Sequence, residues 1–161
     1  PQKAYIDVNN IQFNVYQANM PQTISDFCKE TGQDVPQTIG EIAQCVYKSL
    51  ALKFCESFEG VLGVLGEKLD LVHIVGGGTQ NRLECQWIAN ALDLPVVCGP
   101  TETTAVGNLM FQLKAAGEFE TLEEGRKICA GSSELYELQP EDTGFWKEEY
   151  ACYEKTMQEL K

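Results

Sequence analysis

Basic residues are scarce in this chain of 161 residues. It has 12 lysines and arginines against 24 aspartates and glutamates, which gives a formal net charge of −12, and no run of lysine and arginine interrupts this balance. A nucleic-acid-binding protein needs a basic stripe that neutralises phosphates, and an anionic membrane surface attracts the same kind of patch. The composition therefore argues against nucleic acid and against a membrane as partners.

Residues that bind metals are also few. His73 is the single histidine, and the seven cysteines include no CxxC pair, so no spacing typical of a zinc site occurs. An odd number of scattered cysteines favours reduced thiols that pack as small apolar side chains. We expect no metal-binding residue in the chain. Because it has no signal peptide and no apolar run of membrane length, we expect a cytoplasmic location.

Two common nucleotide-binding motifs are incomplete or missing. The sequence has no GxxxxGK[ST] segment, which excludes a P-loop. Residues 76–81 supply the first two glycines of GxGxxG, but Asn81 occupies the position of the third. A dinucleotide-binding module also needs an acidic residue at the end of a second strand, and the segment 96–98 has none. Such a Rossmann-type module is therefore an alternative rather than the main interpretation.

The most informative stretch is residues 71–92. An apolar run that includes Val72 and Ile74 leads into the three glycines Gly76–Gly78, and a helical pattern follows. This order predicts a strand, a glycine turn and a helix, which together place free backbone N–H groups and the positive end of a helix dipole at the carboxyl end of the strand. Phosphate or ribose can bind at such a corner. A turn that merely packs tightly, in a domain with a non-catalytic interaction role, remains the other interpretation.

The rest of the pattern predicts an α/β chain that is rich in helix. We expect helices over residues 21–31, 38–66, 82–92, 103–116, 121–131 and 145–160, strands over 71–75 and 94–98, and an extended segment over 134–138. Capping boxes, in which a threonine and a glutamate three residues later cap each other, occur at Thr38 and Thr121. Thr101 or Thr103 is expected to cap the helix that follows.

Apolar residues indicate which parts of these elements are buried. In the helix over 38–66 an apolar stripe is predicted to pack in the core; it comprises Ile42, Val46, Leu50, Phe54, Phe58, Val61, Leu62 and Leu65. Residues 1–20 look irregular, with Ile6, Phe13, Val15 and Tyr16 as the expected anchors to the body.

The predicted sheet is too small for the chain. Two strands joined through a helix form a βαβ unit, which is expected to be right-handed, but two strands alone are not stable. We therefore expect further strands either from residues 1–20 or from polypeptide that lies outside this sequence. In the second case a sheet edge remains unpaired, and such an edge favours self-association.

Two segments carry a resemblance to a known family. HIVGGGTQN at residues 73–81, followed by GPTETTAVGNLMFQLKAAGEF at residues 99–119, resembles the C-terminal domain of the FGGY carbohydrate kinases. The resemblance covers nearly the whole chain. It implies that residues 1–161 form a single domain, the C-terminal ATP-binding lobe of an actin-like, ribonuclease H-like ATPase fold with a small, truncated sheet. The N-terminal lobe and its first phosphate-binding hairpin are then missing.

The resemblance also implies an activity and a set of contacts. ATP and Mg²⁺ would bind in the full-length enzyme, and the hydroxyl group of a ketose, L-rhamnulose, would attack the γ-phosphate. Gly76, Gly77 and Gly78 are expected to contact adenosine and the adjoining phosphate, and Gln80 and Asn81 the adenine or ribose. The catalytic aspartate is expected outside this chain, as are the contacts to the sugar. The chain is therefore expected to be inactive alone.

Overall fold

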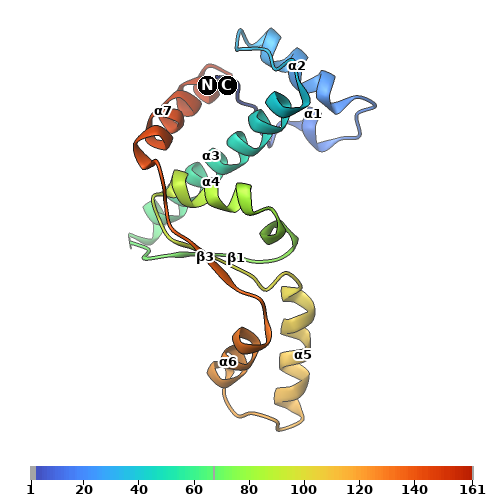
Figure 1. Cartoon of the computed structure of the whole chain (residues 1–161), viewed down its shortest axis with the longest axis vertical. Helices are drawn as coiled ribbons and strands as arrows, with labels where there is room; N and C mark the ends of the chain where they lie inside the picture. The colour runs from blue at the N-terminus through green and yellow to red at the C-terminus, as the bar shows by residue number, and fades with distance from the viewer. Residues whose placement is uncertain (1–2, 67, 161) are drawn as a thin grey trace.

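The computed structural model describes residues 3–66 and 68–160, which form helices around a small sheet (Figure 1). The elements in chain order are α1 (Ile11–Asn14), α2 (Met20–Glu30), α3 (Ile39–Leu65), β1 (Val72–Ile74), the 3-10 turn η1 (Gly77–Gln80), α4 (Arg82–Leu92), β2 (Val96–Cys98), α5 (Thr103–Ala115), α6 (Leu122–Ser132), β3 (Tyr136–Leu138) and α7 (Thr143–Glu159). In the described part of the chain, every helix is too short or too polar to span a membrane.

The sheet has three strands in the order β1-β2-β3. β1 and β2 are parallel, with Val72 opposite Val96, and α4 connects them, which confirms the predicted strand–helix–strand order. β3 pairs antiparallel with β2. The third strand thus comes from the predicted extended segment, and the expectation of a strand within residues 1–20 is wrong for the described residues. There Asn10 accepts a hydrogen bond from the N–H of Gln12 and starts the short helix α1 instead.

Most helix boundaries follow the caps seen in the sequence. Both capping boxes are present, Thr38 with Glu41 at the start of α3 and Thr121 with Glu124 at the start of α6. Gly66 ends α3 in the left-handed conformation, with a φ of 67°. These caps form between residues three or four positions apart, so they depend on the local sequence alone.

The predicted cap of α5 is wrong. The residue at the N-cap is Glu102, and its side chain makes no capping hydrogen bond. The two threonines have other partners: Thr103 Oγ1 donates to the carbonyl oxygen of Pro100 at 2.6 Å, and Thr101 Oγ1 lies 3.2 Å from Thr79 Oγ1. Thr101 is therefore directed toward the turn after β1 rather than toward its own helix.

The core has two clusters. The larger one lies where α3, α4 and α7 meet the sheet, and includes Leu52, Ile88, Val96 and Tyr153. The smaller one joins the N-terminal segment to α2 and the start of α3 through Ala4, Ile6, Ile24, Phe27, Cys28 and Cys45. All seven cysteines are free thiols, and five of them are buried.

Two of the four expected N-terminal anchors are wrong. Ile6 is buried and Phe13 packs against the smaller cluster, as predicted. Val15 and Tyr16 are exposed, and Tyr16 leaves 92% of its surface accessible. The reason is that α1 ends at Asn14, after which the chain is extended and leaves the cluster.

The apolar stripe of α3 is only partly in the core, which corrects the prediction. The buried face of the helix α3 carries small residues, among them Ala51 and Cys55. These allow α4 and α7 to approach α3 closely. Phe54, Val61 and Leu65 of the stripe are exposed. Helical periodicity shows which residues share a face, but the neighbouring elements decide which face is covered.

The helices α5 and α6 form a pair that projects from the rest of the molecule (Figure 1). None of the residues of α5 is buried. The pair packs at Gly125, where a Cβ atom would lie 2.7 Å from Phe119 Cε2 and 3.0 Å from Met110 Cγ. α5 is joined to the sheet through the Gly99-Pro100-Thr101 segment at its N-terminal end.

A buried ion pair joins α3 to α7. Lys48 Nζ lies 2.6 Å from Glu149 Oε2, and the two side chains are 3% and 5% exposed. Tyr5 donates its hydroxyl hydrogen to the same carboxylate oxygen at 2.9 Å. Burial, followed by this hydrogen bond to Glu149, raises the pKa of Tyr5 well above its usual range, so the hydroxyl stays protonated. The N-terminal segment, α3 and α7 thus meet at one carboxylate.

Replacing Glu149 by alanine should therefore be strongly destabilising. The change removes the carboxylate that balances the buried Lys48 ammonium group, and we expect the free energy of unfolding to fall by about 3–5 kcal/mol. Urea unfolding would measure this. The matched control is Glu123→Ala, which breaks the exposed pair with Lys127 and should cost less than about 1 kcal/mol. Equal effects of the two variants would contradict the assignment.

A second prediction concerns the end of β2. Gly99 has a φ of 108°, and a Cβ there would lie 2.7 Å from the carbonyl oxygen of Glu134. Gly99→Ala should therefore lower the free energy of unfolding by about 1–3 kcal/mol, the usual cost of a strained backbone residue. Gly60→Ala is the control: a Cβ at this site in α3 meets nothing within 4 Å, so it should stabilise the helix by up to about 1 kcal/mol. A Gly99→Ala variant as stable as the parent chain would disprove the close approach.

Candidate nucleotide-binding site

The chain turns sharply after β1. Gly76 has a φ of 88°, and its N–H donates to the carbonyl oxygen of Pro100 at 3.0 Å, so the turn is tied to the end of β2. The N–H of Thr79 donates back to Gly76 at 3.1 Å, and that of Asn81 to Gly78 at 3.1 Å. The three glycines thus lie in and just before a short 3-10 turn of their own. α4 begins only at Arg82, after this turn, and not directly after the glycines.

The outer side of this turn is open. A Cβ placed on Gly76, Gly77 or Gly78 would meet no atom within 4 Å. Among the residues that the structure describes, the N–H groups of Gly77 and Gly78 have no hydrogen-bond acceptor. A turn made of glycines for tight packing would place atoms close to these positions. The geometry instead leaves room for another group to approach the backbone.

Asn81, one of the predicted contacts, is the N-cap of α4. Its Oδ1 accepts the N–H of Glu84 at 3.3 Å, and its Nδ2 donates to Glu84 Oε2 at 3.2 Å. Burial raises the pKa of Glu84, and the hydrogen bond from Asn81 acts against this rise. The positive end of the α4 dipole is therefore already compensated by the chain's own side chains. These two bonds use one N–H of Nδ2 and one acceptor site of Oδ1, so Asn81 keeps a second donor and a second acceptor site for a ligand while it caps α4.

A polar pocket of about 320 Å³ lies beside the turn. Its lining residues are Thr79, Gln80, Arg82, Thr101, Glu134, Leu135 and Tyr136. Gln80, a predicted contact, is exposed and belongs to this lining. The guanidinium carbon of Arg82 lies 4.2 Å from the centre of the Tyr136 ring, so a cation and an aromatic face form part of the wall. Such a mixture of hydrogen-bonding and aromatic groups suits a small polar ligand with a ring.

Side chains from β3, α4 and the turn itself hold the carbonyl groups of the turn. The Tyr136 hydroxyl donates to the carbonyl oxygen of Thr79, and Thr79 Oγ1 donates to that of Gly76 at 2.7 Å. Burial raises the pKa of Tyr136 above its usual range, so this donor stays protonated. Cys85 Sγ lies 3.6 Å from the carbonyl oxygen of Gly78, and burial raises its pKa to about 11. The carbonyl oxygens of Gly76, Gly78 and Thr79 thus accept hydrogen bonds from side chains of the protein. Gly77 and Gly78 are exposed to solvent.

Of the seven lining residues, only Gln80 was predicted as a contact from the sequence. Thr101 lies in the family segment 99–119 but was predicted only as a helix cap, and Arg82 and Tyr136 belong to no motif. Tyr136 lies 57 positions after Thr79, with which it is hydrogen bonded. Only the pairing of β3 with β2 brings this tyrosine to the turn. The alternation in residues 134–138 was the one local signal that could have placed it on the sheet.

The described residues do not form a metal site by themselves. No group of three histidine, cysteine, aspartate or glutamate side chains lies close enough together in residues 3–66 and 68–160 to hold an ion. A divalent cation bound here would therefore need further oxygen ligands, such as those of a bound phosphate group.

Comparison with known proteins is informative for the same region. The C-terminal domain model of the FGGY family of carbohydrate kinases matches residues 4–116, a range that extends from α1 through the turn to the end of α5. The rhamnulokinase of Bacteroides thetaiotaomicron is 37% identical over 133 residues, which are 83% of this chain and 27% of that protein. That of Lactiplantibacillus plantarum is 36% identical over 141 residues, 88% of this chain and 29% of that protein.

A third relative extends the match almost to the full chain. The rhamnulokinase of Enterococcus faecalis is 36% identical over 155 residues, 94% of this chain and 31% of that protein. The chain thus spans about three tenths of the length of these relatives. The family match covers most of the chain, including β1, the glycine turn and β2. The resemblance seen in the sequence is therefore confirmed, and the chain belongs to the FGGY family of carbohydrate kinases.

Proposed function

We propose that this chain is the adenosine-binding part of an ATP-dependent sugar kinase that converts L-rhamnulose to L-rhamnulose 1-phosphate. The family match and the three relatives named rhamnulokinase support this proposal. In this proposal residues 1–161 are one domain, the C-terminal ATP-binding lobe of an actin-like fold, and the sugar contacts and the catalytic aspartate lie outside the chain. A cytoplasmic location remains a prediction.

The observation that carries the proposal is the open glycine turn beside the polar pocket. In open α/β sheets, ligands bind at the carboxyl ends of the parallel strands, and both features lie there. Gly77 and Gly78 would donate their N–H groups to ribose or phosphate oxygens, with Gly76 setting the direction of the turn. Gln80 would hydrogen bond to the base or ribose from the pocket wall, and Asn81 would contribute its second amide N–H.

Charge limits what the chain can do alone. Phosphoryl transfer depends on positioning and on neutralising phosphate charge, and this chain has a net charge of −12. Mg²⁺, when bound with ATP, supplies the neutralisation, and its ligands would be phosphate oxygens and groups outside the described residues. The contribution of this chain is to bind and orient the adenosine end. We therefore propose that it is inactive without the rest of the enzyme.

Titration calorimetry with ATP and with NAD tests this assignment. We expect weak ATP binding, because the other lobe and its phosphate-binding groups are absent, and no preference for NAD. Tight NAD binding would favour a Rossmann-type module, and no binding of either nucleotide would favour a non-catalytic interaction domain. A submicromolar dissociation constant for ATP would contradict the expected weakness.

The variant Gly77→Ala tests the position of the ligand. The added methyl group meets no protein atom, so the free energy of unfolding should change by less than about 0.5 kcal/mol. The same methyl group would occupy the side from which a ligand approaches, so ATP affinity should fall by about tenfold, or roughly 1.4 kcal/mol. Gly131→Ala, at another open position, is the control and should leave ATP affinity unchanged. Unchanged affinity in Gly77→Ala would place the ligand elsewhere.

We also propose weak self-association through the outer edge of β1. Val72 donates its N–H to Pro95, and the carbonyl group of Ile74 accepts from Gly99. Both therefore face β2, and by alternation the N–H of His73 faces outward. Sedimentation should show a mass that increases with concentration, and His73→Pro, which removes the outward donor, should lower it. A clean monomer at high concentration would count against this proposal.

A further inference from the structure

Arg82 is the one basic residue among the described residues that line the polar pocket. It is the first residue of α4, and its guanidinium carbon lies 4.2 Å from the centre of the Tyr136 ring. At this distance the planar guanidinium group packs on the ring in a cation–π contact. In the described part of the chain the Arg82 side chain has no ion pair and no hydrogen bond. Its N–H groups and its second face are therefore available to a ligand.

Tyr136 is fixed in position by two sets of contacts. In β3 it lies opposite Cys98 of β2, and its hydroxyl donates to the carbonyl oxygen of Thr79 in the turn. Because the ring is bonded to both the sheet and the turn, it gives Arg82 a fixed surface on which to pack. A side chain that is already stacked loses less conformational freedom when a ligand binds than a freely rotating one does.

The charges at the pocket decide which end of a nucleotide it can accept. Glu134 contributes a carboxylate to the same lining, so the formal charges of the lining side chains, Arg82 and Glu134, cancel. A triphosphate carries several negative charges, and Glu134 would repel it. A base is uncharged and planar, and it can stack on the second face of the Arg82 guanidinium group. The pocket therefore suits the base better than the phosphates.

The pocket and the glycine turn adjoin each other. Gly77 and Gly78, whose N–H groups have no acceptor within the described residues, precede Arg82 by five and four residues. Thr79 and Gln80 lie between them in the sequence, and both line the pocket. One nucleotide can therefore reach the pocket with its base and the turn with its phosphates.

We propose that Arg82, stacked on Tyr136, is the surface on which the base of the bound nucleotide packs. The ribose then lies beside Gln80, and the phosphates extend toward the N–H groups of Gly77 and Gly78. The inference rests on the proposed nucleotide binding at the glycine turn, and it adds a binding residue from outside the glycine motif.

Titration calorimetry can separate binding of the base from binding of the phosphates. ATP and inorganic tripolyphosphate are titrated into the full chain and into its Arg82→Ala and Arg82→Lys variants. In Arg82→Ala the affinity for ATP should fall by about five- to tenfold, the lower part of the range for losing one stacked base, and the affinity for tripolyphosphate should not change. Arg82→Lys keeps the charge but loses the planar group, so it should restore little of the ATP affinity. Because Arg82 is exposed, the thermal unfolding midpoints of both variants should stay close to that of the parent chain.

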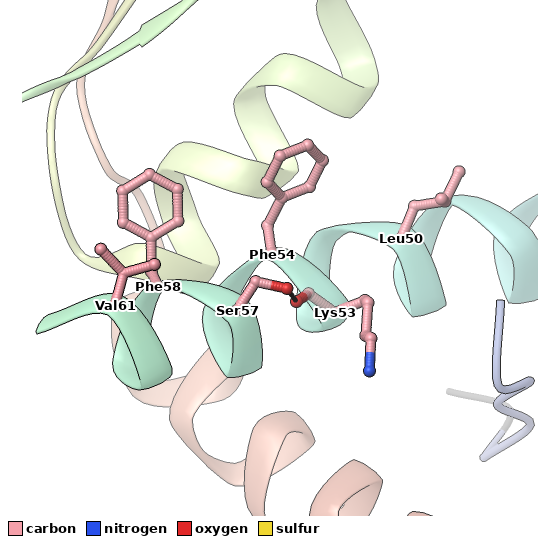
Figure 2. Close-up of a pocket in the computed structure, with 6 residues that line it drawn as sticks. All are labelled: Leu50, Lys53, Phe54, Ser57, Phe58 and Val61. Carbon is pink, nitrogen blue, oxygen red and sulfur yellow. Dashed lines mark hydrogen bonds between the residues drawn. The ribbon is translucent and has the colours of Figure 1, made fainter. Parts of the chain in front are cut away.

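Two variants control for the loss of a positive charge in general. Arg126→Ala removes the other arginine of the chain, which lies in α6. Lys53→Ala removes a cation from a pocket of about 260 Å³ on α3, which Leu50, Phe54 and Phe58 also line (Figure 2). α3 contributes no residue to the polar pocket. Both control variants should leave the affinity for ATP unchanged.

The outcomes distinguish this inference from the proposed function. Equal ATP binding by the parent chain and by Arg82→Ala would overturn the inference and leave nucleotide binding at the turn intact. Full recovery of ATP affinity in Arg82→Lys, or an equal loss of tripolyphosphate affinity in Arg82→Ala, would also overturn it, because either result would assign Arg82 to the phosphates. A parent chain that binds no ATP would contradict the proposed function, and this inference with it.

Discussion

The candidate site depends on the backbone hydrogen bonds that join the ends of β1 and β2. Gly99 donates its N–H to the carbonyl group of Ile74, and Gly76 donates to that of Pro100. These bonds fix the turn after β1 against the segment after β2, and they bring Thr79 next to Thr101. Gly99 makes this possible, because any side chain there would collide with Glu134. The open turn, the polar pocket and the start of α5 are therefore parts of one assembly.

Local interactions explain why much of the fold could be predicted from the sequence. The capping boxes at Thr38 and Thr121 and the left-handed Gly66 each involve residues within one turn of a helix. The strand, glycine turn and helix of residues 72–92 could also be predicted from the sequence. The change from an apolar run to glycines and then to a helical pattern is a local signal. The family resemblance at the same residues is confirmed by the match to residues 4–116.

Tertiary contacts explain what could not be predicted. Tyr136 supports the turn only because β3 pairs with β2, a contact between distant segments. The cap of α5 was wrong because tertiary partners engage both Thr101 and Thr103. The whole apolar stripe of the helix over 38–66 was assigned to the core, because periodicity cannot tell which of two apolar faces meets a neighbour. In this helix Ala51, Leu52 and Cys55 are buried, whereas Phe54, Val61 and Leu65 are exposed.

The α5–α6 pair has a mechanical consequence. α5 is joined to the sheet at its N-terminal end, where Thr101 lies beside Thr79 at the pocket, and α6 is the element on which it packs most extensively. A helix of 13 residues is about 20 Å long. A small change in the tilt of α5 at its N-terminal end therefore produces a larger displacement at its C-terminal end. Any shift of Thr101 that accompanies filling of the pocket would be carried outward to the loop between α5 and α6.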